Sequence, residues 1–166
     1  MLQVLLEDRF HLKVHWEKKE LPVYALTVAK NGPKLKKARP GGVKLSDGSE
    51  VEFHGFRDFG LVPTPGGDRR TLGFLASSMD DAARDFANFL DRPVVDRTGL
   101  KGMYDFTIEF ENDPDAPTPG IAFNPFNGLT ASALSAALQG LGLRLESSKA
   151  PLQVLVIDRV EKPSEN

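Results

Sequence analysis

Three stretches of the chain show the same succession of hydrophobic patterns, first with helical spacing and then with alternation. They cover residues 1–29, 71–111 and 129–161. Apolar residues three or four apart predict an amphipathic helix, and strict alternation predicts a half-buried strand. A unit of this kind cannot bury its own apolar face, so several must pack together. We therefore predict an α+β fold of repeated helix–strand–strand units, with helices packed on an antiparallel or mixed sheet.

The first unit is predicted to contain a helix followed by two strands. The helical spacing is carried by Leu2, Leu5, Leu6 and Phe10. Alternation over residues 10–16 predicts the first strand, and residues 23–28 predict the second. The polar run 17–20 separates them and is predicted to be a turn.

The third unit resembles the first. Thr130 is placed to cap a helix whose apolar residues are Leu134, Ala137, Leu138 and Leu141. Two strands are predicted after it, over residues 143–146 and 152–160, with a turn at 147–150. The likeness of residues 22–28 to residues 151–157 is the clearest sign of an internal repeat.

The second unit contains the strongest strand signal. A short strand over 71–76 is followed by a helix that Ser78 can cap and that Pro93 is expected to end. The apolar stripe of this helix is Met79, Ala82, Ala83, Phe86, Phe89 and Leu90. A strand is predicted to begin at residues 94–95, and strict alternation predicts another over residues 104–110.

A turn motif is predicted between these two strands, formed by Asp96, Thr98, Gly99, Gly102 and Tyr104. The Asp96 side chain can accept backbone N–H groups, and the two glycines permit positive φ. We interpret this motif as structural rather than catalytic.

Two segments between the units are predicted to be loop insertions in a single domain of residues 1–166. The first covers residues 30–70 and contains a hairpin signal, with strands at 43–45 and 51–53, and a flexible connector at 63–67. The second covers residues 112–128 and is rich in Asp, Pro, Gly and Asn. The predicted first helix starts at Met1 without a capping residue, so we expect upstream sequence to be missing.

Composition excludes several classes of site. The 166 residues include no cysteine, which excludes disulfides, thiolate metal ligands and cysteine nucleophiles. The net charge of −2 argues against broad nucleic-acid binding. No apolar run reaches the roughly 20 residues that a membrane-spanning helix needs. The first residues are not expected to form a signal peptide, because acidic and basic residues follow the short apolar run almost at once.

The three histidines are the first candidates for catalytic or metal-binding residues. His11 and His15 are four residues apart, but on a strand this spacing places them on an outer face beside Lys13 without a third metal ligand. His54 near Asp58 is the remaining candidate for a catalytic pair. We predict no catalytic, metal-binding or cofactor-binding residues, and no cofactor.

A basic stretch lies in the first insertion. Its cations are Lys30, Lys34, Lys36, Lys37 and Arg39, with no acid between them. Such a stretch can meet an anionic surface or polymer, but it is more often a solvated loop. No aromatic residues are interleaved for stacking on bases, so nucleic acid is not predicted as a partner.

Three motifs resemble a soil-associated bacterial family of unknown function that is abundant in Acidobacteria. They are residues 92–106 (RPVVDRTGLKGMYDF), residues 21–26 (LPVYAL) and residues 160–166 (VEKPSEN). Members usually carry an N-terminal export signal and further upstream residues, which implies a periplasmic or secreted protein. The family has no established activity, so the resemblance implies no catalytic residues.

A second resemblance is one of pattern. Residues 71–160 are similar to the short N-terminal domain of secretins and TonB-dependent receptors. Those domains are periplasmic modules for protein interaction and signalling, although likeness of fold does not establish function.

These observations favour a non-catalytic interaction module of the bacterial cell envelope. Its partner would be an envelope protein or a cell-wall glycan, without nucleic acid and without a membrane span, and nothing in the sequence specifies an oligomeric state. The alternative is a small-ligand-binding protein or an enzyme with a pocket under segments 30–70 and 112–128. A third possibility is a fragment whose activity lies in upstream sequence.

Overall fold

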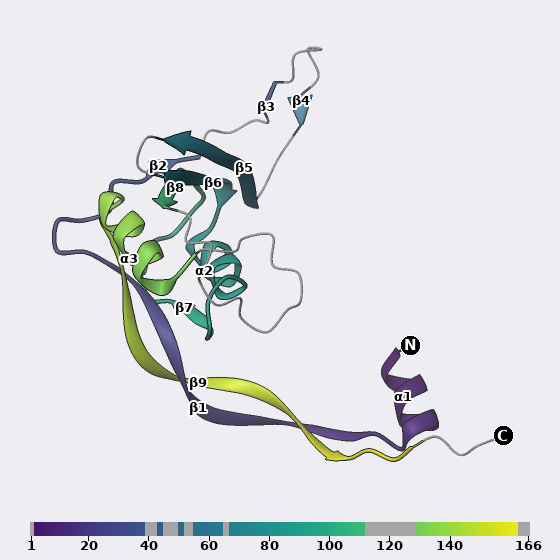
Figure 1. Cartoon of the computed structure of the whole chain (residues 1–166). Coiled ribbons are helices and arrows are strands. Elements are labelled where there is room, and N and C mark those ends of the chain that lie inside the picture. The colour runs from purple at the N-terminus through teal and green to yellow at the C-terminus, as the bar shows by residue number, and fades with distance from the viewer. Residues whose placement is uncertain are drawn as a thin grey trace. The chain divides into compact units, whose positions relative to one another are not determined.

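The computed structural model describes residues 2–38, 43–44, 50–51, 55–64, 67–111 and 129–162. The chain forms two compact structural units, which differ from the three predicted sequence repeats and are called unit 1 and unit 2 from here on (Figure 1). Unit 1 comprises Met1–Leu21 and Lys149–Asn166, and unit 2 comprises Pro22–Ser148. The single-domain organisation predicted for the chain stays a prediction, and each unit is described by itself.

Unit 1 consists of one helix and parts of two long strands. Helix α1 spans Leu2–Phe10, as predicted. Strand β1 spans Lys13–Val28 and strand β9 spans Leu143–Arg159, and the two are neighbours in one sheet. The Phe10 carbonyl accepts a hydrogen bond of 2.8 Å from the Glu161 amide, which ties the end of the helix to the end of β9.

The turns predicted at residues 17–20 and 147–150 are wrong, because β1 and β9 run through them without a break. Neither segment contains Gly, Asn or Pro, the residues that tight turns favour most. The side chains of residues 17–20 are all exposed, so a strand with two solvated faces accommodates four charged residues in a row. The repeated helix–strand–strand organisation stays a prediction.

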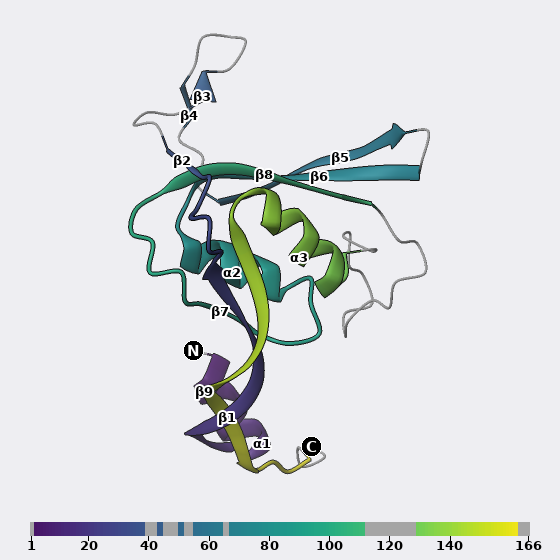
Figure 2. The same ribbon diagram turned by 90° about the vertical axis from the view of Figure 1, so that its left-hand side faces the viewer.

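Unit 2 contains the remaining elements. Its helices are α2 (Met79–Ala87) and α3 (Ala131–Gly140). Its further strands are β2 (Lys36–Lys37), β3 (Val43–Lys44), β4 (Glu50–Val51), β5 (Gly55–Thr64), β6 (Gly67–Ser77), β7 (Val94–Asp96) and β8 (Tyr104–Glu111). The strand orders are β7-β1-β9, β2-β8-β6-β5 and β3-β4. Helices α2 and α3 lie on one face of the β2-β8-β6-β5 sheet (Figure 2). The α+β class is therefore confirmed.

An aromatic cluster forms the centre of the core between this sheet and the helices. The ring of Phe74 stacks on Phe106 with centroids 4.6 Å apart and meets Phe86 edge to face at 5.2 Å. The alternation predicted for β8 is confirmed, since Tyr104, Phe106, Ile108 and Phe110 are buried. Strands β6 and β8 and helix α2 are thus joined through three rings.

Both predicted helix caps are confirmed. The Ser78 side chain accepts from the Asp81 amide, and the Thr130 side chain accepts from the Ala133 amide, each at 3.1 Å. Helix α2 ends at Ala87 rather than near Pro93. Phe89 and Leu90 lie beyond the helix but are buried, so the apolar pattern continued past the helix itself.

The prediction of a loop over residues 30–70 is wrong where β5 lies. This strand pairs antiparallel with β6 from Gly55↔Leu75 to Thr64↔Gly67. Its register shifts between Asp58 and Leu61, which breaks the two-residue period by which a strand is recognised. The predicted hairpin is confirmed by the Val43↔Val51 pair of β3 and β4. The predicted loop at 112–128 lies outside the described residues.

Gly142 is held in close contact with another backbone segment of unit 2. Its φ is +70°, and a Cβ atom there would lie 2.0 Å from the Gly32 carbonyl oxygen. Gly32 has a similar φ of +74°, but a Cβ at that position meets nothing within 4 Å. An alanine at Gly32 would meet backbone strain alone, whereas an alanine at Gly142 would meet both strain and a steric clash.

We expect Gly142→Ala to lower the free energy of unfolding by about 3 kcal/mol or more, because strain and overpacking add. Gly32→Ala should lower it by only about 1–2 kcal/mol, from strain alone. Urea unfolding followed by circular dichroism measures both. Equal losses in the two variants would contradict the predicted close contact.

Candidate interaction surfaces

Unit 1 exposes large apolar side chains on its strand pair. We call Trp16, Leu155 and Ile157 the strand-pair surface; their exposed fractions are 67%, 50% and 60%. Among the described residues of unit 1, Ala150 alone is buried. An exposed set of this kind is typical of a site that another molecule covers.

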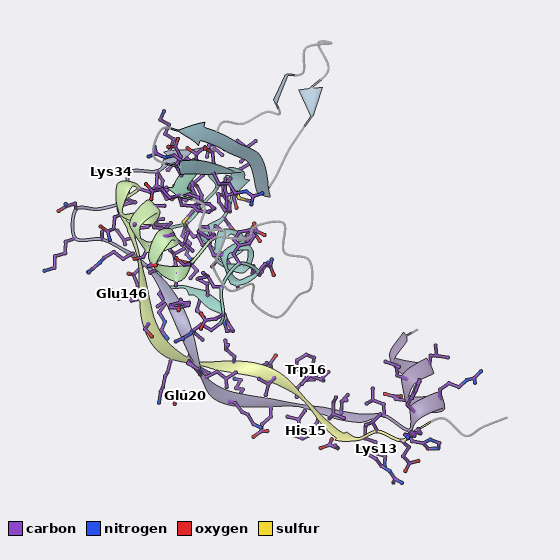
Figure 3. The ribbon with its side chains drawn as sticks, viewed as in Figure 1. Lys13, His15, Trp16, Glu20, Lys34 and Glu146 are labelled. Carbon is purple, nitrogen blue, oxygen red and sulfur yellow. The ribbon has the colours of Figure 1, made fainter. Side chains whose placement is uncertain are left out.

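The pairing of β1 with β9 determines which side chains share a face. The His15 and Asp158 side chains are hydrogen-bonded across the two strands, so they share one face of the pair. Trp16 and Ile157 are the residues next to them on each strand and therefore project together to the opposite face. Adjacent residues project to opposite faces, and Trp16 and His15 lie on opposite sides of the ribbon (Figure 3).

The histidines lie beside carboxylates rather than with each other. His15 Nδ1 is 2.9 Å from Asp158 Oδ2, and His11 Nδ1 is 3.7 Å from Glu161 Oε2. Within the described ranges, no three His, Asp or Glu side chains form a group able to hold a metal. Sequence reasoning missed both partners because they lie more than 140 positions away along the chain.

The strand pair also has open backbone edges. Strand β7 pairs with β1 only at Tyr24, Ala25 and Leu26, all in unit 2. In the part of unit 1 that the structure describes, no third strand flanks β1 or β9. Open edges leave amide and carbonyl groups that an added strand can use.

The predicted turn motif uses its polar groups within the turn. Asp96 Oδ1 accepts from the Thr98 amide at 2.8 Å and from the Thr98 hydroxyl at 2.7 Å. The Tyr104 hydroxyl donates to the Lys101 carbonyl at 3.0 Å. Gly99 and Gly102 have φ values of 68° and 107°. These contacts stabilise the connection from β7 to β8.

A polar cluster joins β1 to the segment before β7. The Tyr24 hydroxyl donates to Asp91 Oδ1 at 3.1 Å, and Arg92 donates to Asp91 Oδ2 through Nε at 3.1 Å and Nη2 at 2.9 Å. Arg92 Cζ lies 4.8 Å from the centre of the Tyr24 ring. The cluster lies where two of the sequence motifs meet. Residues 21–26 and residues 92–106 are far apart in the sequence but side by side in the fold.

The cluster shifts the pKa of two of its groups. Partial burial, followed by the hydrogen bond to Asp91, raises the pKa of Tyr24. The hydrogen bonds from Arg92 are the main cause that lowers the pKa of Asp91. Because the folded pKa of Tyr24 is raised, its stabilising contribution is complete below pH about 10 and is lost as the pH rises through that folded pKa.

We expect Asp91→Asn to lower the pKa of Tyr24, because it removes both a charged acceptor and a nearby negative charge. The sequence has two tyrosines, so a Tyr104→Phe background isolates Tyr24. Ultraviolet absorbance of tyrosinate as a function of pH measures the midpoint. An unchanged midpoint in Asp91→Asn would show that the two side chains do not interact.

Two hollows lie along the basic stretch of unit 2. The first has a volume of about 520 Å³ and is lined by Ala29, Lys30, Asn31, Gln139 and Arg144. The second has a volume of about 330 Å³ and is lined by Lys34, Lys36, Gly73, Leu75, Asp105, Phe106, Thr107 and Leu141. The predicted His54–Asp58 pair lies outside the described side chains, so the pocket proposed around it stays a prediction.

A family model described as "Protein of unknown function (DUF3738)" matches residues 1–160. The chain belongs to this family. No curated protein and no solved structure matches the chain. The resemblance to a family of unknown function is thus confirmed, while the soil-associated origin and the likeness to the secretin module stay predictions.

In the described part of this DUF3738 chain, no helix is long and apolar enough to cross a membrane.

Proposed function

We propose that this DUF3738 chain is a non-catalytic interaction module of the bacterial cell envelope that binds a protein partner through the strand-pair surface. The observation that carries the proposal is the exposure of Trp16, Leu155 and Ile157 on a unit in which, among the described side chains, Ala150 alone is buried. Removing exposed apolar side chains from water is favourable, so covering them with another molecule would stabilise a complex.

Covering the strand-pair surface supplies part of the free energy that specific binding needs. Covering a large apolar side chain contributes about 2 kcal/mol, so three contribute at most about 6 kcal/mol before costs. Micromolar affinity corresponds to about 8 kcal/mol, but association also costs translational and side-chain freedom. Hydrogen bonds from an added strand at the open edge of β1 or β9 supply the remaining stabilisation and fix the register.

The envelope location rests on the two resemblances of the sequence. Family members resembling the three motifs carry export signals, and the short N-terminal domains of secretins are periplasmic interaction modules. A protein partner is favoured over a cell-wall glycan for this surface because aliphatic side chains accompany the single tryptophan. A glycan would instead need polar groups around its hydroxyls.

The test is affinity capture from an envelope extract with a tagged chain and two variants. We expect the unmodified chain to retain one dominant, salt-resistant protein, and Trp16→Ser with Ile157→Ser to lose it by at least tenfold. Met103→Ser is the matched control, because Met103 is an exposed apolar residue of unit 2, at 46% exposure. Mass spectrometry quantifies the captured protein.

Equal capture by all three proteins would contradict the assignment of the surface. Recovery of the chain with sedimented cell wall, reduced by the same double substitution, would replace the protein partner with a glycan. Melting curves of the variants check that each remains folded.

The alternative of a small-ligand binder or enzyme rests on one observation. Lys34 and Lys36 come from the segment 30–70 and line the second hollow beside the sheet. Two cations beside an apolar wall favour an anionic ligand.

A further inference from the structure

We propose that unit 2 contains a binding site for an acidic glycan, formed by residues 29–37 together with Arg144. This site is separate from the strand-pair surface and does not depend on the function proposed for it. The ligand class is a polysaccharide that carries carboxylates, such as a polyuronate. The site combines cations, a backbone that holds them in place and two hollows.

The cations belong to one segment that the fold holds at several points. The Ala29 amide donates to the Gly142 carbonyl at 2.9 Å, and the Lys34 amide donates to the Leu141 carbonyl at 2.8 Å. Further along, Lys36 and Lys37 pair with β8 as strand β2. The backbone around Lys30, Lys34 and Lys36 is therefore positioned before any ligand arrives, which a solvated loop would not achieve.

The first hollow combines charge with amide groups. Lys30 and Arg144 provide cations, Asn31 and Gln139 provide amides, and no carboxylate is among its described lining residues. Arg144 Nη1 lies 3.5 Å from Glu146 Oε1, with both side chains about half exposed, so water screens this pair strongly. Guanidinium and amide groups together suit a ligand that presents carboxylates and hydroxyls.

The second hollow adds an apolar wall to two more cations. Gly73 pairs with Thr107 across β6 and β8, and both line the hollow with Leu75 and Leu141. Small residues at this cross-strand pair leave space above the sheet, beside Lys34 and Lys36. Asp105 also lines this hollow, but its Oδ1 accepts a hydrogen bond of 2.8 Å from the Ala76 amide. A sugar ring presents C–H groups as well as hydroxyls, which matches this mixed lining.

The hollows are close enough for one molecule to occupy both. Asn31 lines the first hollow and Lys34 lines the second, so three residues separate them. Even a fully extended chain spans only about 10 Å over that distance. On the other side, Gln139 and Leu141 are two residues apart. Four cations on a continuous path indicate a polymer with repeated charges rather than a single small anion.

A glycan fits this surface better than a nucleic acid. Single-stranded nucleic acids are bound by exposed aromatic rings on which bases stack. The described lining of the two hollows includes one aromatic residue, Phe106, which is buried in the core.

The test measures binding of polygalacturonate oligomers to the full chain by isothermal titration calorimetry at low salt. We expect Lys30→Ala with Arg144→Ala, and separately Lys34→Ala with Lys36→Ala, to weaken binding by about tenfold each. Combining all four should abolish it. Lys18→Ala with Lys101→Ala is the matched control, because both are exposed lysines that line neither hollow, and it should bind normally.

A second variant separates shape from charge. Thr107 is exposed and lies on the floor of the second hollow, so Thr107→Phe fills the space without changing any charge. We expect this variant to weaken binding of long oligomers while galacturonate itself binds equally weakly to both proteins. Melting temperatures show whether each variant is folded.

Three results would overturn the proposal. Equal binding of neutral dextran would show that carboxylates are not recognised. Equal or tighter binding of single-stranded DNA of the same charge would show general attraction of anions. Loss of affinity in the control pair as large as in the other pairs would show that the hollows play no part.

Discussion

The packing of Phe74 between Phe86 and Phe106 is the contact on which unit 2 depends. It joins β6 to α2 on one side and to β8 on the other, so the sheet and helix cannot separate without breaking it. The Ser78 cap lies only four residues from Phe74 along the chain and sets where α2 begins. Core packing and helix capping thus act at the same junction, where a strand gives way to a helix.

Unit 1 is stabilised differently, because its strands pair without a comparable core. A two-stranded pair is marginal in water unless its apolar face is covered. Trp16 and Ile157 share such a face, and both remain exposed. The two units therefore differ in what they expose: unit 2 has hollows lined by cations, whereas unit 1 has exposed apolar side chains.

Local signals predicted much of unit 2 from the sequence. Ser78 and Thr130 were recognised as caps, and the alternation of β8 matched its buried and exposed faces, because these features depend on neighbouring residues. The continuous strands β1 and β9 were not predicted, since runs of charged residues usually mark turns. Strand β5 was missed because a register shift breaks its periodicity.

The candidate surfaces were harder to predict for another reason. Their contacts join residues far apart in the chain, such as Tyr24 with Asp91 and Lys34 with Leu141. No pattern within one segment reports such a pairing. The basic stretch was visible in the sequence, but its interpretation as a solvated loop had no information on Arg144 or on the hollows beside it.

The left-handed conformation of Ala76 marks the point where strand β6 gives way to helix α2. This residue has a φ of 42° and lies where the pairing of β6 with β8 is interrupted, next to Ser77 and the start of α2. Its amide is held by the Asp105 carboxylate, which also lines the second hollow. A side chain of the neighbouring strand thus keeps a strained backbone position in place, and the direction in which α2 leaves the sheet depends on that one carboxylate as well as on the residues of the turn itself.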